Sequence, residues 1–418
     1  MKKYLQWLVS TLVLTIIIFP QSPPVDTLTV RKALSLAYEM NPGLRKLKAE
    51  MAATRGMLTG NSGLSDPVIT YSREGMGNGS FSGFDEQRVG VSQDIRFPGT
   101  TAGMSDNYKN RFEALQLEYK ALQLEIREQV KKKYVELQAG LEKLHLARQD
   151  FDISTRVYEV VQEKYRSGEA TKIELLKTKI QVDEASNSIS EAQLALHEAR
   201  YSLFNLIGLE TTQQKYSINY PDTLSYQKVI ISQEDILSTF TEMPAVLAKM
   251  KHINAAQDEL GIAKSSYYPN FTLDLFGQDF GSGFKSVGFE IGLSVPLWFS
   301  SNQAGLIEQA EAGLNSKKED YREELLLMKK EVEVAWHGYE SARENLDRYN
   351  EGILANSQEL LDLTTEGYRL GELDFLNLLE AQRTFLTSSR NYYNYLLEYH
   401  FRLIELEKFS SKEFIYQE

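Results

Sequence analysis

The 418-residue chain contains no cysteine. Disulfide bonds therefore cannot hold its fold, which must rest on packing and hydrogen bonds, and no N-terminal cysteine can carry a lipid anchor. The chain also lacks any Lys/Arg-rich run, and 46 basic against 58 acidic side chains leave a net charge of −12. Because nucleic acid binds through clustered cationic side chains, we expect no nucleic-acid partner.

Long apolar runs are missing as well, except at the start of the chain. Residues 1–22 resemble a secretory signal peptide, with Lys2 and Lys3 followed by the apolar run Leu12–Phe19. An N-terminal membrane anchor is the alternative interpretation. After this segment no stretch approaches about 18 consecutive apolar residues. Any membrane insertion of the mature chain must therefore use β-strands.

The chain repeats one pattern at a spacing of about 202 residues, too consistently for chance matches of common residues. The clearest matches are Asn41-Pro42-Gly43 with Met243-Pro244-Ala245, Gly90-Val91-Ser92 with Gly292-Leu293-Ser294, and, with one residue inserted, Tyr165-Arg166-Ser167-Gly168-Glu169 with Tyr368-Arg369-Leu370-Gly371-Glu372. We predict a first repeat at 26–210, a linker at 211–231 and a second repeat at 232–411.

Each repeat is predicted to contain one helix, two strands and two long helices. In the first repeat we expect helices at 29–59, 103–165 and 169–208 and strands at 67–74 and 87–97. In the second repeat we expect helices at 232–265, 303–366 and 372–409 and strands at 269–279 and 286–297.

The long helices carry coiled-coil spacing, in which apolar or small residues alternate in steps of three and four. One such seam runs from Val182 to Leu206. In the second repeat the predicted seam comprises Leu325, Met328, Val332, Ala335, Tyr339, Ala342, Leu346, Tyr349, Ile353, Asn356, Leu360 and Leu363. A helix of about 63 residues is on the order of 95 Å long. Such helices must pack along neighbours of similar length, antiparallel across the breaks at Gly168 and Gly371.

The predicted strands alternate apolar and polar residues in the manner of strands that cross an outer membrane. Their apolar side chains would face lipid, and Asp94, Asp274 and Glu290 would face a water-filled lumen. An ordinary half-buried sheet is the alternative. Four strands cannot close a barrel, which needs about eight. Two chains would give a filled eight-stranded barrel and three a twelve-stranded one with room for a pore, which the polar face favours.

With these residues in view, the mature chain resembles the TolC-like outer-membrane factors of tripartite efflux pumps and type I secretion systems. Segments such as Asp66-Pro67-Val68 and Phe97-Pro98-Gly99 are most similar to the outer-membrane subunits of cobalt-zinc-cadmium-type cation efflux. The resemblance implies a mainly α fold with a transmembrane β part. A trimeric twelve-stranded barrel, with four strands per chain, would continue into a long periplasmic α-helical barrel. It also implies location in the outer membrane of a Gram-negative cell.

The same resemblance implies passive conduction of substrate, heavy-metal cations or drugs, for an inner-membrane pump of the resistance-nodulation-division type joined by a periplasmic adaptor. It implies a periplasmic gate, for which Glu174, Asp374 and Glu380 are the candidates, since a homotrimer would turn each into a ring of like charges. A solvated helix surface is the competing interpretation, and Asn377 replaces a second acidic gate position of the family. The candidate adaptor-docking turns are Gly168, Glu169, Gly371 and Glu372.

No pattern in the sequence indicates an enzyme, a cofactor or a metal site. The five histidines lack metal-ligand spacing, although His197 and His400 occupy equivalent repeat positions. Two other interpretations stay open: a type I protein secretion channel, and a periplasmic coiled-coil adaptor or structural protein. The adaptor would have the helices without lipid-facing strands.

Overall fold

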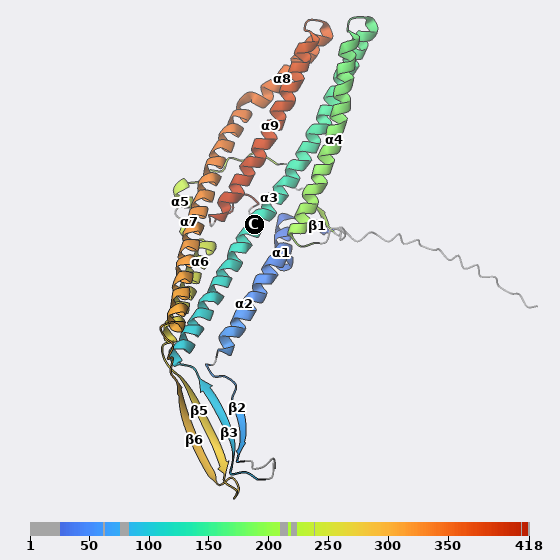
Figure 1. Cartoon of the computed structure of the whole chain (residues 1–418). Coiled ribbons are helices and arrows are strands. Elements are labelled where there is room, and N and C mark those ends of the chain that lie inside the picture. Colours follow the sequence, from blue (N-terminus) through green and yellow to red (C-terminus); the bar gives the residue numbers. More distant parts are fainter. Residues whose placement is uncertain are drawn as a thin grey trace, which may run out of the picture.

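The computed structural model is an elongated molecule with a four-stranded sheet at one end and two helical hairpins at the other (Figure 1). It describes residues 26–61, 63–75, 83–209, 216–218, 224–237, 239–410 and 412–416. The predicted signal peptide, residues 1–22, lies outside these ranges. Most described residues are helical, and none of the described helices combines the length and the apolarity that a bilayer span needs.

The first repeat contains α1 (Val30–Met40), α2 (Pro42–Gly60), β2 (Val68–Glu74), β3 (Glu86–Ile95), α3 (Pro98–Ser167) and α4 (Lys172–Leu206). The single helix expected at 29–59 is wrong, because the chain breaks at Asn41. The Asn41 side-chain oxygen accepts hydrogen bonds from the backbone N–H groups of Gly43 and Leu44 and so caps α2. Its amide nitrogen donates to the Leu206 carbonyl, which joins the end of α4 to the start of α2.

The second repeat contains α5 (Gln233–Leu237), η1 (Phe240–Glu242), α6 (Pro244–Ser265), β5 (Asn270–Asp279), β6 (Ser286–Ser294), α7 (Asn302–Arg348), η2 (Tyr349–Ile353), α8 (Leu354–Leu370) and α9 (Phe375–Lys408). The continuous helix expected at 232–265 is also wrong. The chain leaves the helix after Leu237 and breaks again at Met243, the repeat equivalent of Asn41. Pro244 follows this second break and can begin a helix but not continue one.

The predicted helix 303–366 is interrupted by the π-helical turn η2, and this turn corrects the predicted seam. The seam is right as far as Leu346, which is fully buried. Beyond η2 the predicted Leu360 and Leu363 are exposed, and the buried side chains are Ser357, Leu361 and Thr364. A π turn holds one residue more than an α turn, so every later seam position moves by one.

The sheet has the order β2-β3-β5-β6, and all three strand pairs are antiparallel. A second, two-stranded sheet was not predicted. In it β1 (Asp26–Leu28) pairs in parallel with β4 (Tyr216–Ile218), so part of the predicted linker lies beside the start of the first repeat.

A buried ion pair joins the last helix to the middle of α3. Lys131 Nζ lies 2.8 Å from Glu407 Oε2, and the two side chains are 1% and 2% exposed. The other Glu407 oxygen accepts hydrogen bonds from the backbone N–H groups of Phe414 and Ile415. Lys131 also donates to the Ile415 carbonyl. This pair therefore holds the C-terminal segment against both α3 and α9.

Candidate functional site: helical tips and sheet face

Two turns of nearly identical geometry end the helical hairpins. Gly168 (φ 84°) and Gly371 (φ 83°) both adopt the left-handed conformation, which glycine accepts without steric cost. The N–H of Glu169 donates to Lys164 O over 2.7 Å, and the N–H of Glu372 donates to Gly367 O over 2.8 Å. All four predicted docking residues are exposed at these turns. Both turns lie at the same end of the molecule, away from the sheet (Figure 1).

Two of the three gate candidates cap the helices that follow the turns. Glu174 closes a capping box: its Oε2 accepts from the Thr171 N–H at 2.6 Å, and its own N–H donates to Thr171 Oγ1. Asp374 caps α9 by accepting from the Asn377 N–H at 2.9 Å. Sequence reasoning missed both roles, although the Thr-x-x-Glu spacing at 171–174 is itself a capping signature. Glu380 lies further along α9 and is exposed.

The two hairpins of one chain touch near their tips. An apolar cluster that includes Val157, Val161, Tyr368, Phe375 and Leu378 joins them. Lys164 Nζ lies 5.2 Å from the centre of the Tyr368 ring. Burial, with a smaller contribution from the Glu174 carboxylate, raises the pKa of Tyr368 to about 12. Glu174 of one hairpin thus lies close enough to act electrostatically on the other, whereas the structure records no contact between Glu380 and the other two candidates.

The strand register places the three predicted lumen residues on one face of the sheet. Ser92, Asp274 and Glu290 stand opposite one another across three strands, and Asp94 stands opposite Thr272, whose hydroxyl donates to Asp94 Oδ1 at 3.0 Å. The same face carries Arg88, as the alternation of the strand predicts. Its guanidinium lies 3.9 Å from the centre of the Phe276 ring and 4.0 Å from Glu290 Oε2.

The opposite face of the sheet is exposed and largely apolar, and it turns polar at Arg73, Gln87 and Asp279 near the hairpin tips. Ile69, Val91, Leu275 and Phe289 stand side by side across the four strands. The exposed apolar side chains of this face include Ile69, Tyr71, Val89, Val91, Leu275, Val287, Phe289, Ile291 and Leu293. A contiguous apolar surface of this extent is unfavourable in water and favourable in lipid. An ordinary half-buried sheet would need a covering layer on this face, and no described element supplies one (Figure 1).

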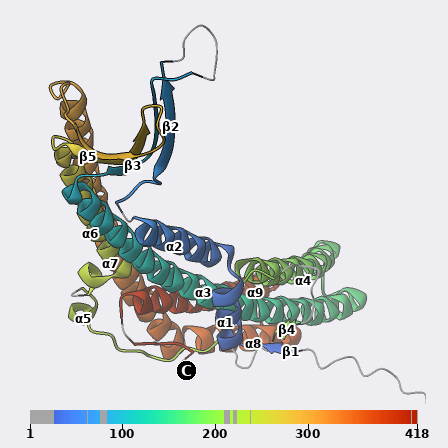
Figure 2. The ribbon, with the colours of Figure 1, turned by 90° about the horizontal axis from the view of Figure 1, so that it is seen from below.

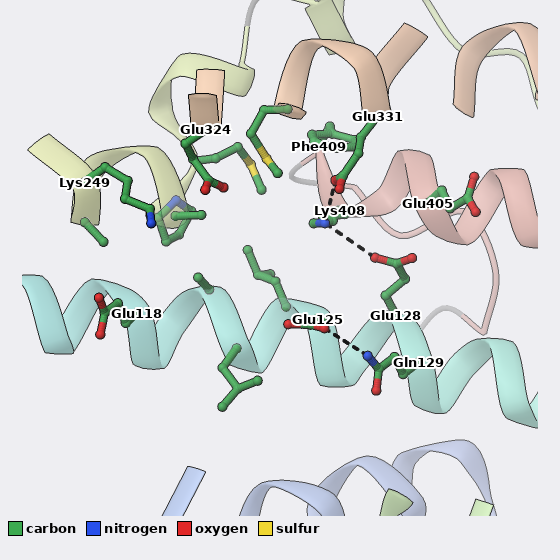
Figure 3. A pocket seen from close by; sticks show the side chains of 18 of the residues that line it. Glu118, Glu125, Glu128, Gln129, Lys249, Glu324, Glu331, Glu405, Lys408 and Phe409 are labelled. Atoms are coloured by element: carbon green, nitrogen blue, oxygen red, sulfur yellow. Dashed lines mark hydrogen bonds and ion pairs between the residues drawn. The ribbon is translucent and has the colours of Figure 1, made fainter. Parts of the chain in front are cut away.

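A cavity of about 710 Å³ lies where α6 and α9 meet between α3 and α7 (Figure 3). Its walls carry several glutamates, and two of its three cations, Lys408 and Arg402, are paired with glutamates. Lys408 lies 3.0 Å from Glu331 and 3.8 Å from Glu128, and Arg402 pairs with Glu405. We interpret the cavity as the joint between two stacked helices. Throughout the described ranges, no group of three or more His, Asp or Glu side chains could hold a metal ion.

The repeat-equivalent histidines differ in their surroundings. His197 is exposed, whereas His400 is buried on α9 with its Nε2 3.2 Å from the Ser225 carbonyl oxygen. Burial disfavours the imidazolium and holds the pKa of His400 below its usual value, while the Ser225 carbonyl opposes this shift.

Acid is therefore expected to weaken the packing around His400. The unfolded chain takes up this proton near pH 6.5 and the folded chain only at lower pH. The stability contributed by neutral His400 is present above about pH 6.5 and is lost as the pH falls toward the folded pKa. Between about pH 7.5 and about pH 5.5, the Tm should fall less in His400→Gln than in the wild type, while His197→Gln should match the wild type. Equal falls in all three proteins would contradict the assignment.

Comparison with known proteins identifies relatives over nearly the whole chain. The family model described as outer membrane efflux protein matches residues 34–209 and again 240–410. The cobalt-zinc-cadmium resistance protein CzcC of Cupriavidus metallidurans is 20% identical over 90% of this chain and 88% of that protein. The pyoverdine export outer membrane protein OpmQ of Pseudomonas aeruginosa is 23% identical over 82% and 72%. The solved outer-membrane channel OprN superposes with a TM-score of 0.80 over 91% of this chain and 89% of that one, at 15% identity.

Proposed function

Because the chain belongs to the outer membrane efflux protein family, we propose that it is the channel subunit through which a tripartite system exports small substrates across the outer membrane. It is a passive channel and not an enzyme. Its sheet lies in the outer membrane, and its helical part lies in the periplasm. The fold is mainly α with a transmembrane β part, as predicted.

The observation that carries this proposal is an open four-stranded sheet with one apolar face. β2 and β6 are its edges, and unpaired edge groups in lipid cost several kcal/mol each. Three copies joined edge to edge give twelve strands and remove every edge. The polar faces with Asp94, Asp274 and Glu290 then line the passage. The periplasmic adaptor interpretation is wrong, because a protein that stays in the aqueous periplasm would expose this apolar face to water, which is unfavourable.

A periplasmic adaptor and an inner-membrane pump complete the system. We place the adaptor on the turns at Gly168, Glu169, Gly371 and Glu372, and we infer a pump of the resistance-nodulation-division type. The substrates are heavy-metal cations or small organic compounds. The names of CzcC and OpmQ support one class each, since one is a cobalt-zinc-cadmium resistance protein and the other exports pyoverdine.

A deletion of the gene tests this function. We expect greater sensitivity to cobalt, zinc and cadmium, or to drugs and detergents, with unchanged secretion of large polypeptides. Complementation with the wild-type gene is the control. If polypeptide secretion alone is lost, the type I secretion alternative is right. Recovery of the protein in the soluble periplasmic fraction would contradict the channel proposal.

We assign the periplasmic gate to Glu174, Asp374 and Glu380, each forming a ring of three carboxylates in the trimer. Such rings attract cations and repel anions. The solvated-surface alternative predicts no effect of these charges on conduction. Glu174 and Asp374 need careful substitutions, because their carboxylates also cap helices.

Two variants of Asp374 separate charge from capping. Asparagine caps helices about as well as aspartate, so Asp374→Asn should keep the stability and remove the ring charge, while Asp374→Ala should lose about 1 kcal/mol in addition. In planar bilayers we expect both variants to show a lower cation-to-anion permeability ratio than the wild type. Glu372→Gln, on the neighbouring turn, is the control. An unchanged ratio in Asp374→Asn would remove this residue from the gate.

A further inference from the structure

The two hairpins of the sheet have the same internal register. In the first hairpin Val68 stands opposite Ser92 and Tyr71 opposite Val89. Adding 202 to each number gives Asn270 opposite Ser294 and Leu273 opposite Ile291, which are the observed pairs of the second hairpin. The repeat that is visible in the sequence is therefore exact in the backbone pairing, and the two hairpins are equivalent building blocks.

One joint between such blocks is visible inside the chain. β3, the second strand of the first hairpin, pairs antiparallel with β5, the first strand of the second hairpin, so that Val91 stands opposite Leu275 and Ser92 opposite Asp274. The next joint along a closed ring would connect β6 of one copy to β2 of the following copy. Since neighbouring strands alternate in direction along the sheet, these two edges also meet antiparallel.

The β3–β5 pairing inside the chain, shifted by the repeat, predicts how β6 pairs with β2 of the next copy. Under the shift of 202, β3 becomes β6 and β5 becomes β2. We propose that in the trimer of the proposed function, on which this inference rests, β6 pairs with β2 of the neighbouring copy so that Ser294 stands opposite Ser72, Leu293 opposite Arg73 and Gly292 opposite Glu74.

Most side chains fit this register. On the lipid face Val295, directly after β6, comes beside Tyr71, and both are exposed in the single chain. The exception is Arg73, near the tip of the first hairpin, which stands beside Leu293 on this face. On the lumen face Ser294 meets Ser72. A slip of one residue would set every apolar side chain against the polar face. A slip of two residues would preserve the faces, so only the repeat distinguishes that register from the proposed one. A uniform joint also gives all strands one stagger, as a closed barrel requires.

The helices leave room for the same contact. α6 packs between α3 and α7, whereas α2 lies against α3 on the side away from α6 (Figure 2). Ala255 on α6 is buried, and its carbonyl accepts a hydrogen bond from Asn107 Nδ2 at 2.6 Å. The repeat equivalents are Ala53 on α2, which is exposed, and Gln309 on α7, which also ends in an amide. The free flank of α2 is therefore the place for α7 of the neighbouring copy.

The charged contacts of α6 are not carried over to this flank. His252 lies 2.7 Å from Glu118 in the chain, but the equivalents are Glu50 and Asp320, which carry the same sign. The helical flank thus indicates where the neighbour lies, and the strand register alone specifies residue pairs.

Disulfide trapping tests the register directly, because the chain has no cysteine of its own. The double variant Ser72→Cys with Ser294→Cys is oxidised with diamide in isolated outer membranes, where two thiols become one disulfide and diamide is reduced. We expect dimers and trimers on non-reducing gels. The slipped pairs Ser72→Cys with Gly292→Cys and Ser72→Cys with Pro296→Cys should cross-link roughly tenfold more slowly, because their Cα atoms lie beyond disulfide reach. Each single-cysteine variant is a control for adventitious cross-linking.

A second predicted pair, Glu74→Cys with Gly292→Cys, guards against misfolding of the first. Preferential cross-linking of either slipped pair overturns the register but leaves the trimeric channel intact. Absence of cross-links from both predicted pairs, in a protein that is a trimer by light scattering in detergent, also overturns the register alone. A monomer in detergent that forms no cross-links overturns the proposed function together with the register.

Discussion

Replacing Ile291 by arginine is expected to deplete the protein from the outer membrane. Ile291 lies near the middle of β6, its side chain is 64% exposed, and it belongs to the apolar face. Arginine on the lipid face of a transmembrane barrel costs about 2–4 kcal/mol at the bilayer midplane. A trimer carries the substitution three times, so the total approaches the whole stability of an ordinary domain. Quantitative blotting of the outer-membrane fraction measures the loss.

The neighbouring residue provides a matched control. Gly292 lies on the opposite, polar face, and a side chain there would meet Thr272 only at an ordinary contact distance of 3.5 Å. Gly292→Arg should therefore insert normally and alter only conduction. Ile291→Leu controls for the change of side-chain shape. Equal depletion by the two arginine variants would show that the faces of the sheet do not divide lipid from water.

Removing the buried carboxylate of Glu407 is expected to be the most damaging change in the helical part. Glu407→Ala removes the carboxylate 2.8 Å from the buried Lys131 ammonium, which then keeps only the partly exposed Glu413 at 3.3 Å. It also removes the acceptor for the N–H groups of Phe414 and Ile415. Loss of one partner of a buried ion pair typically costs about 3–5 kcal/mol. We expect a large fall in the denaturant midpoint and early proteolysis after residue 408.

Two further variants separate the buried charge from charge in general. Glu344→Ala breaks an ion pair with Arg348 that is mostly exposed, so it should change the stability by less than about 1 kcal/mol. The double variant Lys131→Met with Glu407→Leu removes both buried charges and should recover part of the stability, while the N–H groups of Phe414 and Ile415 still lack their acceptor. Similar denaturant midpoints for Glu407→Ala and Glu344→Ala would show that the buried Lys131–Glu407 pair stabilises the fold no more than an exposed ion pair does.

Prediction from the sequence succeeded where structure follows from local alternation. The period of two in the strands placed Asp94, Asp274 and Glu290 on one face, and the register confirms that they share it. The glycines at 168 and 371 were correctly predicted as hairpin turns. The gate role of Glu174, Asp374 and Glu380 stays a prediction. The structure shows that the first two cap helix ends.

The sequence by itself indicated the repeat, the strand faces and the order of the long helices and the four strands of the large sheet, because each depends on nearby residues or on a fixed spacing along the chain. Its resemblance to known channels indicated the family. Only the tertiary structure decided the seam beyond η2, the burial of His400 but not His197, and the pairing of Lys131 with Glu407. These features depend on which distant segments meet. The extra residue of a π turn shifts the orientation of every side chain after it. A charge can be buried only where another segment supplies an oppositely charged partner.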